Sequence, residues 1–111
     1  MDTDALLQKL IEVSEEFKAQ DLRVLEVEKV CDFADYFLIM SGTSNTHVQS
    51  ISDALYLQTK HAGRHAISME GKETGEWVLL DFGEIVVHIF LPQKRAHYDL
   101  EELWTRVEAV E

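Results

Sequence analysis

The chain has 111 residues, of which 46% are apolar, and one cysteine; these values suit a single domain over residues 1–111 and exclude a disulfide-stapled scaffold. Ten basic and 21 acidic residues give a net charge of −11, which argues against direct, sequence-specific nucleic-acid binding and favours a basic protein partner. The N-terminus is acidic where a signal peptide would be basic, and no apolar run approaches membrane-spanning length. We therefore expect a cytoplasmic domain that does not contact membranes.

The first half of the chain alternates between helical and strand patterns. Apolar residues recur every three or four positions between about residues 4 and 19, which predicts a helix that Thr3 can cap. A consecutive apolar run at 36–40 is typical of a strand covered on both faces. The Ser-Gly-Thr-Ser-Asn run after it supplies turn and cap residues for a second helix, which Gly63 ends. A further strand is predicted over 22–27.

The second half is dominated by strand patterns. A short strand is predicted over 65–70, followed by a polar loop at 71–76 that we expect to be mobile. Two apolar runs around Phe82-Gly83 predict a hairpin, and Asp99 can cap a final helix with an apolar stripe. The fold class is therefore α/β (α+β), with a mixed sheet of about five strands flanked by helices.

The hairpin predicts two different sheet faces. If Phe82-Gly83 form the turn, Asp81 pairs with Glu84, and Trp77 lies opposite His88. One face is then uniformly aliphatic and suits a helix-covered core. The other combines apolar side chains with an indole and an imidazole, which suits either core packing or a partner interface. Its members are Trp77, Leu79, Val86, His88 and Phe90.

No catalytic constellation emerges from the residues. The turn at 41–44 could seat an anion at a helix N-terminus, but it lacks a following lysine and reads more simply as a turn and cap. Asp53 has no second carboxylate two residues away, so two-metal nucleotidyl transfer lacks its ligands. His61 and His65 are separated by Gly63, and Cys31 has no evident base. We expect no enzymatic activity, metal or cofactor.

The order and spacing of several short motifs resemble the ribosomal silencing factor, or Iojap-like, family over about residues 4–105. The motifs are Ala34-Asp35-Tyr36-Phe37, Ser41-Gly42-Thr43-Ser44 with Val48, Glu70-Gly71, Trp77, Leu80-Asp81, Gly83, Val87-His88, Arg95, Tyr98-Asp99-Leu100-Glu101 and Leu103-Trp104. The resemblance implies a nucleotidyltransferase-like fold without its catalytic carboxylates. It also implies binding to ribosomal protein L fourteen on the large subunit and a steric block to joining of the small subunit, while organellar relatives act in large-subunit assembly.

The expected contacts with that partner are of two kinds. Aromatic or apolar contacts are assigned to Trp77, Leu79, His88, Tyr98 and Trp104, and acidic contacts to Asp81 and Asp99.

Two other hypotheses about the function stay open. One is a nucleotide-binding transferase that uses the Ser41-Gly42 turn, and the other is a homodimer, when free, that buries the Trp77 face between two copies.

Overall fold

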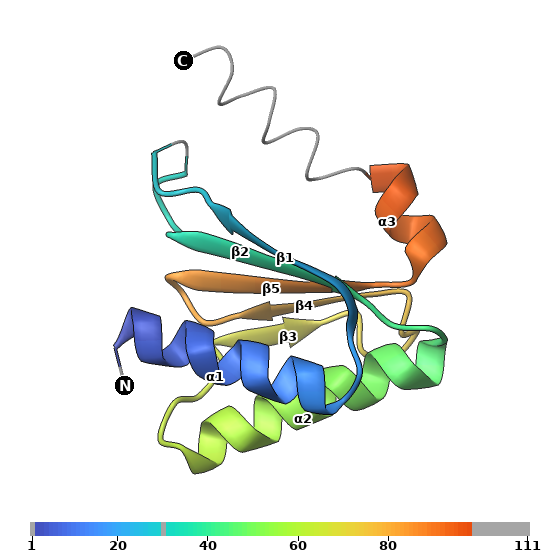
Figure 1. Cartoon of the computed structure of the whole chain (residues 1–111), viewed down its shortest axis with the longest axis horizontal. Helices are drawn as coiled ribbons and strands as arrows, with labels where there is room; N and C mark the ends of the chain where they lie inside the picture. The colour runs from blue at the N-terminus through green and yellow to red at the C-terminus, as the bar shows by residue number, and fades with distance from the viewer. Residues whose placement is uncertain (1, 30, 99–111) are drawn as a thin grey trace.

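A computed structural model, which describes residues 2–29 and 31–98, has a five-stranded mixed sheet with two helices packed on one face (Figure 1). The elements in chain order are α1 (Thr3–Glu16), β1 (Gln20–Glu26), β2 (Tyr36–Ser41), α2 (Asn45–His61), β3 (Ser68–Glu70), β4 (Trp77–Asp81), β5 (Ile85–Phe90) and α3 (Pro92–Tyr98). The predicted fold class is confirmed. Within the described ranges, no helix is long and apolar enough to cross a membrane.

The sheet order is β1-β2-β5-β4-β3, so β2 and β5 are central and β1 and β3 are the edges. The β2–β5 pair is parallel and the other three pairs are antiparallel. This register aligns one row of side chains across all five strands. The row consists of Arg23, Ile39, His88, Leu79 and Glu70.

The main core lies between the helices and the first face of the sheet. Leu6 and Leu10 of α1 and Ile51 and Leu55 of α2 are fully buried against the strands. The strand residues in this core alternate with residues of the opposite face, as the pleat requires. They are Leu38, Met40, Val78, Leu80, Ile85, Val87 and Ile89. The aliphatic face predicted for the hairpin is confirmed.

Both long helices begin at side-chain caps. The cap of α1 is Asp2, whose Oδ1 accepts the Ala5 N–H at 2.8 Å, so the predicted cap at Thr3 is wrong by one residue. This helix also ends three residues earlier than predicted, because Lys18 adopts a φ of +60°. Ser44 caps α2, and its hydroxyl accepts the His47 N–H at 3.1 Å.

The β4–β5 hairpin differs from its predicted register. Trp77 pairs with Phe90 and Asp81 with Val86, two residues away from the expected partners. Phe82 continues the ladder, since its N–H donates to the Ile85 carbonyl at 2.9 Å. The turn therefore consists of Gly83, with a φ of +92°, and the residue after it. The cause is burial: the predicted turn would expose the Phe82 ring, which is 1% exposed in the core.

The sequence patterns did not predict α3, which is the last described element. Helix α3 starts at Pro92, directly after β5, and lies at the end of the sheet where β5 finishes (Figure 1). Proline suits the first turn of a helix because no intrahelical partner awaits its missing N–H. The predicted helix that starts at Asp99 lies outside the described residues.

Candidate functional site

The second face of the sheet, opposite α1 and α2, carries an aromatic cluster. We call this surface the second face; its strand residues are Phe37, Ile39, Trp77, Leu79, Val86, His88 and Phe90. Near β2, three residues between β1 and β2, Val27, Cys31 and Ala34, pack on it. Toward β4, Trp77 and Leu79 are only half-buried. Partly exposed aromatic and apolar side chains of this kind are typical of interface anchors.

The Trp77 ring is held in place by two neighbours. It stacks on Phe90, with ring centroids 4.9 Å apart and an interplanar angle of 25°. Its Nε1–H donates to Nδ1 of His88 at 3.3 Å. The His88 ring in turn lies 4.9 Å from that of Phe37. The indole is therefore oriented before any partner arrives, which lowers the entropy lost on binding.

His88 is buried and neutral. Its side chain is 5% exposed, and burial lowers the pKa of His88 from 6.5 to about 4. Because Nδ1 accepts the indole hydrogen bond, the neutral ring carries its proton on Nε2. Nε2 is buried and has no hydrogen-bond partner in the structure as described. His88 thus fixes the orientation of the Trp77 indole through a hydrogen bond, and it exposes too little surface to make extensive contacts with a partner itself.

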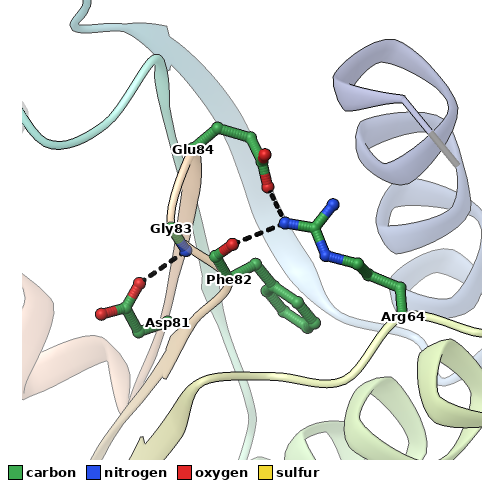
Figure 2. A network of polar contacts seen from close by, with 5 residues as sticks. All are labelled: Arg64, Asp81, Phe82, Gly83 and Glu84. Atoms are coloured by element: carbon green, nitrogen blue, oxygen red, sulfur yellow. Dashed lines mark hydrogen bonds and ion pairs between the residues drawn. The ribbon is translucent and has the colours of Figure 1, made fainter.

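Asp81 belongs to a polar network at the β4–β5 turn (Figure 2). Its Oδ1 accepts the Gly83 N–H at 2.7 Å, which stabilises the turn. On the other side of the turn, the Arg64 guanidinium donates to the Phe82 carbonyl at 2.7 Å and pairs with the Glu84 carboxylate. The carboxylate of Asp81 is half-buried and already serves the hairpin.

A hollow of about 240 Å³ opens at the β3 edge of the second face, lined by Glu70, Gly71, Trp77 and Leu79. Glu70 and Leu79 are cross-strand partners, so their side chains leave the same side of the sheet. Gly71 has a φ of +85°, and a Cβ there would lie 2.0 Å from the Trp77 carbonyl oxygen. Only glycine allows this close approach of the two backbones.

The loop at 71–76, which forms one side of the hollow, is held by α2. The Asn45 side-chain amide donates to the Thr74 carbonyl at 2.7 Å. The Gln49 amide donates to the carbonyls of Lys72 and Glu73 at 2.8 and 3.2 Å. These three bonds connect residues at least 23 positions apart in the sequence. They contradict the expectation of a mobile loop, because its backbone carbonyls are anchored to a helix.

The chemical groups weighed for catalysis are separated or already bonded. The Thr43 N–H donates to His47 Nδ1 at 2.8 Å and the Gly42 N–H to the Phe90 carbonyl at 2.9 Å, so these two donors of the 41–44 turn are used within the chain. Asp53 pairs with Lys72, and Cys31 is buried. His61 and His65 are exposed. In the described part of the chain, no group of three or more His, Cys, Asp or Glu side chains could hold a metal ion.

Of the seven predicted contact residues, the structure brings four together. Trp77, Leu79 and His88 lie side by side on the second face, and Asp81 follows Leu79 along the same strand. Tyr98 ends α3, while Asp99 and Trp104 lie outside the described residues. The sequence reasoning did not assign a role to Glu70. The sequence feature that could have indicated a site here is the Glu70-Gly71 pair, because the glycine allows the loop to approach β4 closely.

The comparisons with known proteins agree on one family. The family model described as "Ribosomal silencing factor during starvation" matches residues 1–111. A ribosomal silencing factor RsfS from Chromobacterium violaceum is 35% identical over 94% of this chain and 85% of its own length, and one from Bacillus subtilis is 36% identical over 94% and 88%. A mouse protein named for mitochondrial assembly of the ribosomal large subunit is 34% identical over 89% of this chain and 45% of its own.

Solved structures agree with the sequence comparisons. A crystal structure of a Chromobacterium violaceum protein superposes with a TM-score of 0.92 at 34% identity and covers 95% of this chain and 88% of that one. A crystal structure from Bacillus halodurans gives a TM-score of 0.84 at 35% identity, with 92% and 95% covered. Family match, full-length relatives and shared fold all point the same way, and the chain belongs to the ribosomal silencing factor (RsfS) family.

Proposed function

We propose that this protein binds the large ribosomal subunit through ribosomal protein L fourteen and, by occupying that site, prevents the small subunit from joining. The observation that carries the proposal is the match to the ribosomal silencing factor family over residues 1–111. The mechanism is occupancy, so no bond is made or broken. In this proposal the protein is not an enzyme, needs no cofactor, and acts on ribosomes in the cytoplasm.

The second face is the surface that we propose contacts the ribosomal protein. Trp77 and Leu79 are its half-buried apolar residues near the β3 edge, and the ring of Trp77 is already fixed by Phe90 and His88. Tryptophans that a partner buries on binding commonly dominate the energy of an interface. The net charge of −11 favours a basic protein partner and disfavours contact with the RNA around it.

Cosedimentation with purified large subunits tests the proposal directly. The wild-type protein should pellet with large subunits and lower the yield of joined ribosomes when small subunits are added. Trp77→Ala should cost about 2 kcal/mol or more of binding, which is roughly a thirtyfold loss of affinity. Leu57→Ala is a matched control, because it shortens an exposed apolar side chain on α2, far from the second face.

The outcomes separate several possibilities. Failure of the wild-type protein to pellet would contradict the proposed function. Equal loss in the Trp77 and Leu57 variants would contradict the assignment of the second face. Circular dichroism spectra show whether each variant is folded, and a Trp77→Ala protein that is unfolded would place the indole in the structural core. Trp77→Phe, which keeps the stacking on Phe90, then provides the binding test.

Large-subunit assembly is a second candidate function, because the mouse relative is named for it. The two functions differ in the substrate on which they act. Mature subunits require no assembly, so a reduced yield of joined ribosomes from purified mature subunits supports silencing. Accumulation of immature large subunits in cells that lack the protein, with normal joining in vitro, would support assembly instead.

Two further hypotheses are tested by simple measurements. Saturable magnesium–nucleotide binding in a calorimeter would support a transferase that uses the Ser41-Gly42 turn, whereas no heat would support the interaction module. Mass measurement with and without ribosomal protein L fourteen shows whether the free protein is a homodimer. If the dimer uses the second face, adding the partner should split it.

A further inference from the structure

The hollow at the β3 edge combines apolar walls with one carboxylate. Leu79 and Trp77 supply the apolar side, and the exposed side chain of Glu70 stands at the rim. Because β3 is an edge strand, no strand of the described part of the chain lies beyond Glu70, and a side chain could enter from that direction. The volume of about 240 Å³ suits one long side chain and is small for a folded element.

The walls of the hollow are rigid on both sides. The Trp77 indole is fixed by stacking on Phe90 and by its bond to His88. The loop that carries Gly71 is fixed by the amides of Asn45 and Gln49, which reach across from α2. A preformed site of this kind binds without first ordering itself, so even a small contact area can contribute to affinity.

The electrostatics of the hollow favour a cation. Within residues 2–29 and 31–98, no basic side chain pairs with the Glu70 carboxylate. The lysines of the neighbouring segments are already engaged, Lys72 with Asp53 at 2.7 Å and Lys94 with Glu76 at 3.7 Å. The free carboxylate, an aromatic wall and the net charge of −11 together attract a positively charged side chain.

We infer that this hollow binds an arginine side chain of the partner protein. The guanidinium pairs with the Glu70 carboxylate and packs against the Trp77 indole, while the methylene groups contact Leu79. Arginine fits better than lysine because its planar group pairs with a carboxylate through two hydrogen bonds and also packs on aromatic rings. The inference rests on the proposed function for the identity of the partner, but the chemistry of the hollow can be tested without it.

The direct test uses nuclear magnetic resonance on the isolated protein. Titration with N-acetyl-arginine amide should shift the Gly71 amide and the Trp77 indole N–H signals in a saturable way. The neutral analogue N-acetyl-citrulline amide should shift them much less, and Glu70→Gln should reduce the difference between the two to the part that Trp77 alone supplies. Equal shifts with the lysine analogue would overturn the choice of arginine, and no selective shift with any cation would overturn the site.

The ribosome provides the second test. Glu70→Gln should weaken binding to large subunits about fivefold at low salt and flatten its salt dependence, as removal of one partly exposed ion pair predicts. Glu73→Gln is the matched control, since it removes an equal charge from the same segment without lining the hollow. If wild type binds and both variants bind alike, the arginine site is wrong and the proposed function stands. If wild type does not bind, the proposed function fails, and the titration alone decides the site.

Discussion

Acid should destabilise this protein through His88 in particular. The ordinary pKa of 6.5 falls to about 4 because the ring is buried, so the unfolded chain binds more protons than the folded one between these values. The contribution of His88 to the free energy of unfolding is therefore fully present above pH 6.5 and is lost as the pH falls toward 4. Between pH 7 and pH 5, this one group should remove about 2 kcal/mol from the free energy of unfolding.

The comparison that isolates this effect is between the wild-type protein and His88→Gln. Glutamine does not titrate, and its side-chain oxygen can still accept the Trp77 indole N–H. Urea unfolding followed by circular dichroism at pH 7 and pH 5 gives the loss of stability for each protein. The wild type should lose about 2 kcal/mol more than the variant, since the other titrating groups are common to both. Equal losses would show that His88 is not held neutral by burial, and the account of the second face would then be wrong.

Two further predictions concern the turns. Gly71→Ala should lower the free energy of unfolding by about 2 kcal/mol more than Gly63→Ala. Both glycines have a φ near +90°, but only at Gly71 would the added Cβ meet a carbonyl oxygen, at 2.0 Å. Thermal unfolding of the two variants measures the difference. Arg64→Met should cost about 1 kcal/mol by removing the partly exposed bonds to Phe82 and Glu84, a loss that urea unfolding should show and that equal stability would contradict.

The hairpin shows which part of a sheet can be predicted from local pattern. The side chains of a strand alternate with a period of two, so the predicted register error of two residues leaves every side chain on its correct face. Trp77, Leu79 and His88 were therefore placed together correctly even though their partners were wrong. The position of the turn is decided by a different effect. The free energy gained by burying the Phe82 ring exceeds the advantage of placing Phe82 and Gly83 in a two-residue loop.

Long-range contacts explain what the sequence could not predict. The loop at 71–76 has a polar composition typical of a mobile segment, yet two amides from α2 bind its carbonyls. The hollow likewise depends on the pairing of Glu70 with Leu79 and on the edge position of β3. Neither follows from periodicity within a single strand, because the loop contacts depend on the packing of α2 and the hollow depends on the order of strands in the sheet. Pro92, in contrast, was a local helix-start signal that the analysis of the sequence did not use.

The choice of histidine at position 88 connects the fold to the proposed binding surface. An apolar ring would pack between Phe37 and Phe90 without leaving a buried donor, whereas the imidazole leaves Nε2 unbonded among the described residues, at a cost of about 1–3 kcal/mol. Stability alone therefore does not favour histidine here. What the imidazole adds is an acceptor at Nδ1, which fixes the orientation of the Trp77 indole. A fixed indole is what a site for a partner side chain requires.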